Sequence, residues 1–574
     1  MNAGAAALVA SVHILFLYPL LNTGLANRPG ELTLLFLLVG PITLLILALP
    51  ATGAYLLYGV FARRPLPRRW LQWRYWGGFF IFHSLGTVAV FAHNAHFYRH
   101  LLDPSSLQRL VAASALILVS ALSVTLAVVP RTLARRRSAR IAALAVVGAG
   151  WLVLAALSVA ERPSSEAAPT VELEPLASQQ PLTIFGIDGL SSELLLPLMS
   201  EGRLPAFSRL VKEGSYGALR AFPPGDGMTL WTTVLTGKEP HRHGVRGLVR
   251  YKLLGADEEI ALAPRGIGFS LVRALGLIHS VPTGPEDCVV KGFADILSAF
   301  HIPSTFLGFL RTVPAANHLP ALLRSPKGSA AAEQTDGMAP WWPRLVAGSS
   351  PPDPLQDEVL AKGLAADLQL LQQATRLRSE ENPPQVLAVR LAGFDYVLHR
   401  FLRFHSPADF GNVPAIALER YGQSVTEYCK FLDEWIGREL EVLHGRGHVL
   451  VISSHGMRAE SIVARAIRHL RGAPPMSGSH HRGPAGIFFL VGPGVRAGHK
   501  VDGARLTDIL PTLLYLQGLP VARDLDGEPL TEALSGSYLE ATPVSSIPSY
   551  EGVSIGEQLH DGWPEPEEEF PLFD

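Results

Sequence analysis

The sequence is poor in charged residues, and neither sign of charge is in excess. Aspartate and glutamate number 50, and lysine and arginine number 49, so only 17% of the 574 residues are charged. Soluble domains average about 25%. The even balance argues against a nucleic-acid-binding protein, which needs a concentrated basic face. We therefore expect no nucleic-acid partner, and we expect part of the chain to lie in lipid.

Cysteine is also scarce, because Cys288 and Cys429 are the only two in the chain. Two cysteines are too few for a disulfide scaffold or for a zinc module built on paired cysteines. A metal site in this protein would have to use histidines and carboxylates. Whether the two cysteines form a disulfide stays open from the sequence.

Long apolar runs account for the low charge, and they are concentrated in the first 160 residues. Each run is near the roughly 20 residues that a helix needs to cross a bilayer. The first run lacks the basic segment and cleavage site of a secretory signal. We therefore predict an all-α transmembrane domain of about five helices over residues 1–160. The five runs are Ala5–Leu21, Leu32–Val60, Trp76–Ala95, Val111–Val129 and Ile141–Ala160.

Arginine is unevenly divided among the loops between these runs. Five arginines (Arg63, Arg64, Arg68, Arg69 and Arg74) follow the second run, and five (Arg131, Arg135, Arg136, Arg137 and Arg140) follow the fourth. The positive-inside rule places both loops in the cytoplasm. The sequence thus predicts a multi-pass membrane protein with a cytoplasmic N-terminus and an extracytoplasmic C-terminal domain.

The pattern changes after a linker at residues 161–180, which is rich in proline, serine and alanine. Short apolar strands then alternate with amphipathic helices, as in an α/β fold with a largely parallel sheet. We predict a domain over residues 181–535 and a solvated acidic tail over residues 536–574. The predicted strands are Leu182–Gly186, Val386–Leu391, His448–Ile452 and Gly486–Val491; the predicted helices include Ser191–Met199, Pro205–Glu213 and Ala415–Leu443.

Polar side chains that can hold a metal follow or precede the predicted strands. Asp188 comes after the first strand, Asp395 and His399 after the second, His455 after the third, and His480 shortly before the fourth. Asp395 and His399 are four residues apart, so one helical turn places them on the same face. Because ligands gather beyond the carboxyl ends of strands in α/β sheets, these residues together predict a cation site.

The loop over residues 222–229 is rich in glycine and proline, and it leads into a helix. Free backbone N–H groups and the positive end of the helix dipole make such a loop a natural anion site.

The order of these motifs resembles the alkaline phosphatase superfamily, and specifically its type I phosphodiesterase/nucleotide pyrophosphatase branch. The resemblance runs from about Leu182 to Leu530. It implies an alkaline-phosphatase-like α/β fold, with a mostly parallel sheet flanked by helices and a cap region inserted at about residues 253–384. The motifs that carry it include Ile187-Asp188-Gly189, Trp231-Thr232-Thr233-Val234-Leu235-Thr236-Gly237, Asp395-x-x-x-His399, Ser454-His455-Gly456-Met457 and Ser477-Gly478-Ser479-His480.

In that family, two zinc ions flank a threonine or serine nucleophile that attacks phosphorus. The resemblance implies that Asp395, His399 and His480 hold one Zn²⁺, with His481 as the alternative to His480. It implies that Asp188 and His455 belong to the second zinc site.

Two departures from the family pattern affect the second zinc site. The family's carboxylate before the histidine is Ser454 in this chain, and the position of the nucleophile is Gly227, which has no side chain. Asp226 and Thr229 are the nearest residues that could substitute as a ligand or a nucleophile. We expect the first zinc site to be intact and the second to be degenerate.

Three functions remain open from the sequence. The first is a membrane-anchored, extracytoplasmic metal-dependent phosphoester or phosphodiester hydrolase. The second is an inactive pseudo-phosphodiesterase that binds a phosphorylated small molecule, lipid or glycan without turnover. The third is a lipid-linked phosphotransferase of the cell envelope, which shares the architecture of membrane helices followed by such a domain.

Overall fold

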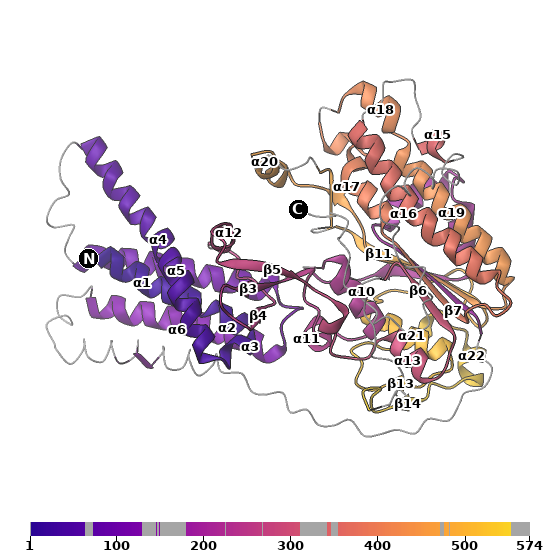
Figure 1. Cartoon of the computed structure of the whole chain (residues 1–574), viewed down its shortest axis with the longest axis horizontal. Helices are drawn as coiled ribbons and strands as arrows, with labels where there is room; N and C mark the ends of the chain where they lie inside the picture. Colours follow the sequence, from indigo (N-terminus) through magenta and orange to yellow (C-terminus); the bar gives the residue numbers. More distant parts are fainter. Residues whose placement is uncertain are drawn as a thin grey trace. The chain divides into compact units, whose positions relative to one another are not determined.

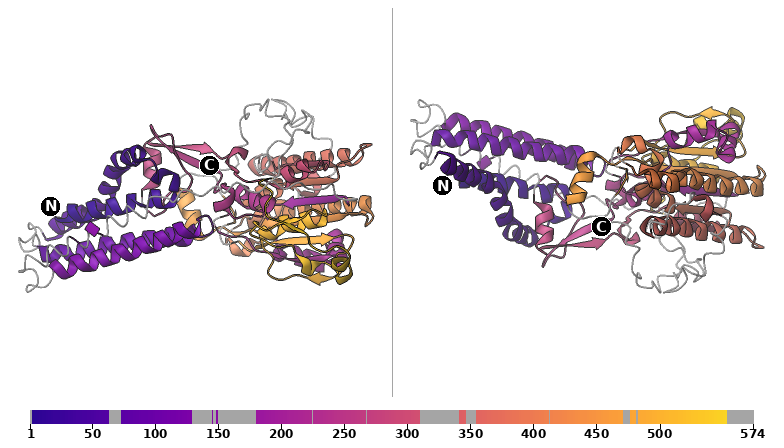
Figure 2. Two further views of the ribbon diagram at one scale, coloured as in Figure 1. Left: turned by 90° about the horizontal axis from the view of Figure 1, so that it is seen from below. Right: turned by 90° about the horizontal axis from the view of Figure 1, so that it is seen from above.

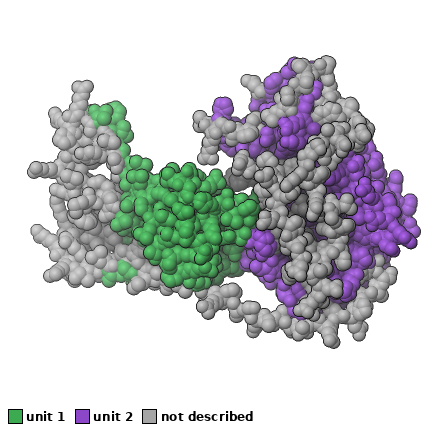
Figure 3. Space-filling view, in the orientation of Figure 1, with its two compact units in different colours: residues 1–165, 245–283 green, residues 166–244, 284–574 purple. Residues whose placement is uncertain are grey.

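The computed structural model divides into two compact units, which are coloured separately in Figure 3. Unit 1 comprises Met1–Ser165 and Val245–Thr283, and unit 2 comprises Glu166–Gly244 and Gly284–Asp574. The structure describes residues 2–62, 73–128, 145, 148–149, 180–223, 225–266, 268–309, 341–345, 354–411, 413–470, 476–480 and 483–552.

Unit 1 is built on helices, as the apolar runs predict. In it, α1 packs against α4 and α5, and α5 packs against α6. The helices are α1 (Asn2–Leu15), α2 (Leu17–Leu21), α3 (Thr23–Ala26), α4 (Pro29–Ala62), α5 (Trp73–Phe97) and α6 (Pro104–Val128).

The prediction of about five membrane spans is wrong for the described part of unit 1. Only two helical stretches there, Pro29–Leu49 and Pro104–Ala121, are long and apolar enough to cross a membrane. The first run falls short because its apolar helical stretch, Ala7–Leu21, is shorter than 18 residues. The fifth run, the linker and most of the arginines that predict the orientation lie outside the described residues.

A segment of the predicted cap region belongs to unit 1 rather than to the α/β unit. Residues 245–283 form a three-stranded antiparallel sheet in the order β4-β3-β5, together with a short helix, α12. Its apolar side chains share a core with those of α1 to α4. The elements are β3 (Val249–Leu253), β4 (Glu259–Ile260), α12 (Phe269–Ala274) and β5 (Ile278–Pro282). Residues 310–340 of the predicted cap lie outside the described residues.

Unit 2 contains a seven-stranded sheet in the order β12-β2-β11-β8-β1-β7-β6 (Figure 1). Only β11 runs antiparallel to its neighbours, so the sheet is mostly parallel, as predicted. The strands are β1 (Leu182–Ile187), β2 (Ser215–Leu219), β6 (Ser304–Leu307), β7 (Val386–Leu391), β8 (His448–His455), β11 (Ala485–Val491) and β12 (His499–Lys500).

The four predicted strands are the long interior ones, which are β1, β7, β8 and β11. Their residues are almost all buried, because helices cover both faces of the sheet and leave no polar face to alternate with. The prediction missed β2, β6 and β12. Two of these lie at the edges of the sheet, and all three have few residues to carry a pattern.

Helices cover the two faces of this sheet as separate layers (Figure 2). One apolar core contains residues of α8 (Ser192–Ser200), α9 (Pro205–Glu213), α16 (Pro354–Arg378), α17 (Gly393–His405) and α19 (Ser424–Leu443). The other contains residues of α10 (Gly227–Thr236), α13 (Phe293–Ala299) and α21 (Ile509–Leu516). Successive residues of β1, such as Ile184 and Phe185, point into different cores, as the pleat of a strand requires.

Two predicted boundaries differ from the structure. The helix predicted over Ala415–Leu443 is two helices, α18 (Ala415–Tyr421) and α19, separated at Gly422 and Gln423. Glycine favours such a break because of its low helix propensity. The start of the predicted tail is folded: α22 (Gly536–Ala541) is followed by β14 (Ser546–Ile547), which pairs with β13 (Val521–Ala522). Residues 553–574 lie outside the described residues.

Helix α17 crosses α16 at a pair of glycines, and this contact allows the backbones to approach closely. A Cβ on Gly393 would lie 2.0 Å from the Gly363 carbonyl oxygen, and a Cβ on Gly363 would lie 2.8 Å from the Gly393 carbonyl oxygen. Only glycine fits at either position without moving a helix. The crossing therefore fixes where α17 begins.

We predict that Gly393→Ala destabilises the protein by roughly 1–3 kcal/mol or more, because the added methyl group overpacks a backbone contact. Gly536→Ala is the matched control, since a Cβ there has no neighbour within 4 Å. Thermal unfolding of the full chain in detergent should show a lower midpoint for Gly393→Ala and a parent-like midpoint for Gly536→Ala. Equal midpoints for the two variants would contradict this account of the crossing.

Candidate metal centre

The candidate site lies where three neighbouring strands of the sheet end. Strands β8, β1 and β7 are adjacent and parallel, so their carboxyl ends share one edge. His455 is the last residue of β8, Asp188 follows β1, and Asp395 lies in the first turn of α17, just after β7. The topology thus brings together residues that are far apart in the sequence.

A small antiparallel ladder brings His480 to the same place. Strand β9 (Arg458–Ala459) follows His455 and pairs with β10 (Gly478–Ser479), which precedes His480. The pairing of β9 with β10 therefore brings the chain from His455 back to the same place at His480. The main chain of Ser477 donates a 2.6 Å hydrogen bond to the His399 carbonyl, which ties the ladder to α17.

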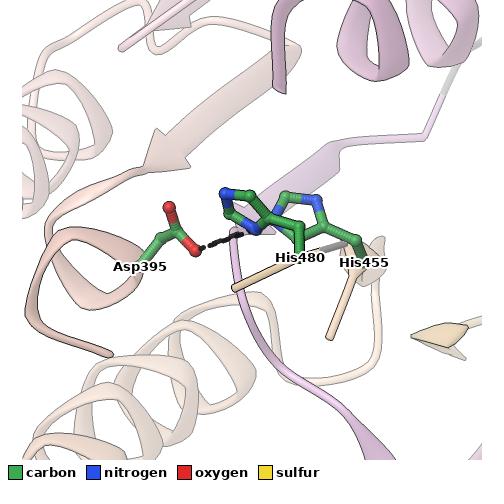
Figure 4. A group of neighbouring side chains, drawn as sticks. All are labelled: Asp395, His455 and His480. Atoms are coloured by element: carbon green, nitrogen blue, oxygen red, sulfur yellow. Dashed lines mark ion pairs between the residues drawn. The ribbon is translucent and has the colours of Figure 1, made fainter. Parts of the chain in front are cut away.

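Asp395, His455 and His480 point one potential ligand atom each toward a common point, as Figure 4 shows. The three atoms lie within 4.8 Å of one another. Asp395 Oδ1 is 3.7 Å from His455 Nε2 and 3.6 Å from His480 Nδ1, so both contacts are too long for good hydrogen bonds. All three atoms are buried without a hydrogen-bond partner. A buried polar atom without a partner is costly, so this convergence calls for a ligand.

His399 contacts the same cluster from one helical turn beyond Asp395. Its Nε2 is 2.9 Å from His480 Nε2 and 3.5 Å from Asp395 Oδ2, while its Nδ1 is 2.9 Å from the Gly478 carbonyl oxygen. If Nδ1 donates to that carbonyl, Nε2 accepts from His480, and His480 Nδ1 then presents a lone pair. In the same way, His455 Nδ1 is 2.8 Å from Ser454 Oγ, which leaves Nε2 to face the cluster. Such outer contacts typically orient metal-bound histidines.

The electrostatics of the cluster keep its carboxylate ionised and the imidazole of His480 neutral. Burial by itself would raise the pKa of Asp395, but the charges of His480, His399 and His455 lower it below its usual range. Burial lowers the pKa of His480 to about 4, so its imidazole is neutral at pH 7. Burial also opposes the charge on His455, yet Asp395 outweighs it and raises the pKa of His455. A carboxylate and a neutral imidazole are the forms that bind metals.

A buried carboxylate on the neighbouring helix holds the start of α17. Asp367 of α16 accepts hydrogen bonds from the main-chain N–H groups of Gly393 (2.8 Å) and Phe394 (3.2 Å), and from the Tyr428 hydroxyl (3.0 Å). It therefore satisfies two of the free N–H groups at this helix end. Asp395 is the next residue, so Asp367 helps to position it.

Asp188, the other predicted carboxylate ligand, already has strong partners. Its Oδ1 accepts a 2.6 Å hydrogen bond from Trp231 Nε1. Its Oδ2 accepts bonds from Arg390 Nε at 3.0 Å and from Arg390 Nη2 at 2.7 Å. The Arg390 guanidinium thus neutralises a carboxylate that the resemblance assigns to a second metal.

The two predicted catalytic residues, Asp226 and Thr229, bond to each other. Asp226 caps α10 by accepting from the Thr229 main-chain N–H at 2.9 Å, and the Thr229 hydroxyl donates to the same carboxylate at 3.2 Å. Thr229 is fully buried, and burial raises the pKa of Asp226. Asp226 thus serves as the N-cap of α10, and the capped helix buries the Thr229 hydroxyl. The predicted catalytic roles of both residues stay predictions.

Gly227, at the family's nucleophile position, lies beside the Asp188–Arg390 pair. A Cβ on Gly227 would be 3.0 Å from Arg390 Nη2 and 3.9 Å from Asp188 Oδ2. A side chain there would face Arg390.

The sequence analysis missed Arg390, Trp231 and Asp367. Arg390 left a visible signal, because it is the one charged residue in the otherwise apolar strand β7. Asp367 lies in a helix with many polar residues, so nothing in its local pattern distinguishes it. His481, the predicted alternative ligand, lies outside the described residues.

The residues present fit a metal ion with oxygen and nitrogen ligands. One carboxylate oxygen and two imidazole nitrogens are typical protein ligands of a zinc site that keeps an open position. Tetrahedral zinc places such ligand atoms about 3.4 Å apart, given metal–ligand distances of roughly 2.0–2.1 Å. The separations of 3.6 and 3.7 Å from Asp395 Oδ1 are near that value.

Part of this chain matches the model of a known family. The model of the type I phosphodiesterase/nucleotide pyrophosphatase family matches residues 182–256 and 315–509. A curated relative is the 2,3-bisphosphoglycerate-independent phosphoglycerate mutase of Cereibacter sphaeroides, which is 29% identical over 105 residues. That alignment covers 18% of this chain and 19% of the mutase, so the chain spans about a fifth of the relative that it matches.

Two solved structures are similar to part of this chain at low identity. A mutant of the alkaline phosphatase PafA is 12% identical with a TM-score of 0.41, and the alignment covers 63% of this chain and 100% of that one. An inactive variant of murine ectonucleotide pyrophosphatase/phosphodiesterase 5 in complex with AMP is 11% identical with a TM-score of 0.37. Its alignment covers 62% of this chain and 100% of that one.

We predict that Asp395→Asn abolishes metal binding, because it removes the charged ligand of the cluster. Asp188→Asn is the matched control: it should lower stability but keep the metal, because both Asp188 oxygens are already occupied. Elemental analysis of the purified full chain measures the stoichiometry of the bound metal. Loss of metal from both variants would place Asp188 among the ligands.

We further predict that stability depends on the ionisation of Asp367. Burial raises the pKa of Asp367 from 3.8 to about 7. Between these values the unfolded chain binds fewer protons at this group than the folded one. Stability is therefore lost as pH rises toward 7, by at most about 1.4 kcal/mol per pH unit. The side chain introduced by Asp367→Asn does not titrate. The thermal unfolding midpoint of the variant minus that of the parent should therefore increase between about pH 5 and about pH 8. A pH-independent difference between the two midpoints would refute the burial of an ionisable carboxyl here.

Proposed function

This chain belongs to the type I phosphodiesterase/nucleotide pyrophosphatase family of the alkaline phosphatase superfamily, and we propose that it is a phosphoester or phosphodiester hydrolase that works with a single metal ion. The metal would be zinc, held by Asp395, His455 and His480. His399 would either join these ligands or orient His480.

The observation that carries the proposal is the convergence of three buried, unpartnered ligand atoms from separate segments. A family member that had lost its metal would be expected to pair or replace such groups, because leaving them unsatisfied is costly. A zinc ion at this position supplies Lewis acidity, which lowers the pKa of water and polarises a phosphoryl oxygen.

We propose one metal rather than two because Arg390 supplies the second positive charge. Asp188 receives three hydrogen bonds from Arg390 and Trp231, and these satisfy the carboxylate without a metal ion. Ser454 has no carboxylate at the position where the family has an aspartate ligand. Gly227 has no hydroxyl at the position where the family has its nucleophile. The charge of Arg390 lies beside Gly227, where it can attract the phosphoryl group of a substrate.

A covalent phospho-enzyme has no candidate nucleophile at Gly227. We therefore propose direct hydrolysis, in which a water oxygen bonds to phosphorus while the bond from phosphorus to the ester oxygen breaks. The departing alcohol takes up a proton, and the second water proton goes to solvent. Arg390 would stabilise the negative charge that builds up on the phosphoryl oxygens.

A binding protein without turnover is the second candidate function. The specific observation that favours it is that Thr229, the nearest hydroxyl, is fully buried and bonded to Asp226. In that case the metal and Arg390 would hold a phosphorylated ligand, and no group would activate the attacking water.

We propose that unit 1 holds this activity at a membrane. Its two apolar stretches, Pro29–Leu49 and Pro104–Ala121, are long enough to cross a bilayer. The arginine-rich loops support an extracytoplasmic unit 2. A phosphorylated lipid, glycan or small molecule would be the substrate in that setting.

The function is tested with the purified full chain, an aryl phosphate and a bis-aryl phosphodiester. We predict zinc-dependent hydrolysis that is lost in Asp395→Asn, and a fall of about 100-fold in kcat/KM for Arg390→Gln, which removes one electrostatic donor. Arg390→Gln should keep its zinc, which separates an effect on the substrate from an effect on the metal.

Zinc binding without turnover of either substrate would overturn the hydrolase in favour of the binding protein. Calorimetric titration with an aryl phosphonate would then measure ligand binding in the parent and in Arg390→Gln. Undiminished turnover in Asp395→Asn would contradict both candidates.

A further inference from the structure

We call the segment over residues 245–283 the insertion. Pairs of hydrogen bonds from asparagine side-chain amides join it to the helices of unit 1. The Asn22 side chain donates to the Leu262 carbonyl at 2.9 Å and accepts from the Leu262 N–H at 2.8 Å. Asn94 forms the same pair with the backbone of Arg265, with both bonds at 2.8 Å. Each asparagine thus bonds to both the N–H and the carbonyl group of one residue of the insertion, as a neighbouring β-strand would. The insertion is therefore anchored to the helices at defined positions.

The contact between the insertion and α4 runs along the axis of the helix. The Glu31 carboxylate, in the first turn of α4, accepts from the N–H groups of Asp257 (3.2 Å) and Glu258 (3.1 Å). Further along, the backbone approaches so closely that a Cβ on Gly268 would lie 2.8 Å from Ile46 Cδ1. Glu31 and Ile46 are about 22 Å apart along a helix that rises 1.5 Å per residue. The insertion thus reaches well into the Pro29–Leu49 stretch.

The part of the insertion that lies deepest along α4 is apolar on its outer surface. We call it the α12 tip, which consists of Leu254 and residues 268–277. Leu254, Leu271 and Leu275 are 49%, 44% and 57% exposed, whereas Val272 is buried against the helices. Arg273 is the only charged residue among residues 266–278. Three exposed leucines on such a short segment are unfavourable in water.

Several backbone N–H groups of the α12 tip donate to carbonyl groups of the tip itself. Leu271 and Val272 donate to the Gly268 carbonyl, Leu275 donates to Leu271, and Gly276 donates to Arg273. Leu254 donates to the Leu277 carbonyl at 2.9 Å and so joins the two parts of the tip. Each N–H group that is paired in this way lowers the cost of placing the segment in hydrocarbon, relative to an open loop.

We propose that the α12 tip is a lipid-contacting surface that enters the bilayer beside α4. Leu254, Leu271 and Leu275 would continue the exposed apolar side of α4, which includes Leu45 and Leu49. The long side chain of Arg273 can extend its charge toward the headgroups. This inference rests on the proposed membrane location of unit 1. It assigns to an insertion of the hydrolase chain the role of a second, non-spanning membrane anchor.

The test uses nitroxide spin labels on the full chain in lipid nanodiscs, in a Cys288→Ser background with the buried Cys429 retained. Labels are placed singly through Leu271→Cys and Leu275→Cys on the tip, Leu45→Cys on α4 and Leu196→Cys on unit 2. Leu196 is 57% exposed, so it is a matched exposed leucine. Collision rates with molecular oxygen and with a water-soluble nickel chelate are measured by electron paramagnetic resonance.

We expect the tip labels to resemble the Leu45 label, with high oxygen and several-fold lower nickel collision rates than at Leu196. Both tip labels could show the collision rates of the Leu196 label while the Leu45 label shows high oxygen and low nickel rates. In that case the tip does not contact lipid, and the membrane location of unit 1 stands. If the Leu45 label also shows the collision rates of the Leu196 label, the proposed membrane location fails, and the proposed lipid contact fails with it. The two tip positions are read independently, so failure of one variant to fold leaves the other decisive.

Discussion

The buried carboxylate of Asp395, whose ion-pair partners among the described residues are all histidines, is the constraint around which unit 2 is organised. Asp395 is held at the end of β7 by the glycine crossing of α16 and α17 and by the Asp367 contacts at the start of α17. Burial of a charge is costly unless it is paired, so the surrounding elements must supply positive charge or leave room for it. The β9–β10 ladder and strand β8 bring two imidazoles to that carboxylate. We propose that a cation completes this arrangement.

Two carboxylates at the same edge of the sheet meet this constraint in different ways. Asp188 is paired with a guanidinium from within the chain, together with an indole N–H. Asp395 faces only imidazoles, two of which leave a nitrogen unpartnered. The difference lies in β7, where Arg390 extends to Asp188 and not to Asp395. We propose that Arg390 thereby takes the place of a second metal ion at this site.

The chain passes between the two units three times, through the linker and through both ends of the insertion. This connectivity was hidden in the sequence, because residues 245–283 lie inside the stretch that carries the hydrolase motifs. Their apolar residues follow the pattern of an ordinary small sheet, and only the packing shows that they share a core with α1 to α4. The predicted cap region at residues 253–384 is thus divided between the two units, and its role as a cap stays a prediction. The asparagines that hold it, Asn22 and Asn94, are unremarkable polar residues at the level of sequence.

The sequence by itself determined the α/β class, the long interior strands and the residues at their ends. Burial on both faces leaves a continuous apolar pattern, and strand ends place polar groups at one edge. Only the tertiary structure decided which of those groups share a site, because partners such as Arg390 and Asp188 are 202 residues apart. It paired Asp188 with Arg390 and Trp231 and made Asp226 a helix cap. Such choices depend on distances of a few ångströms between side chains, which local pattern and motif order do not encode.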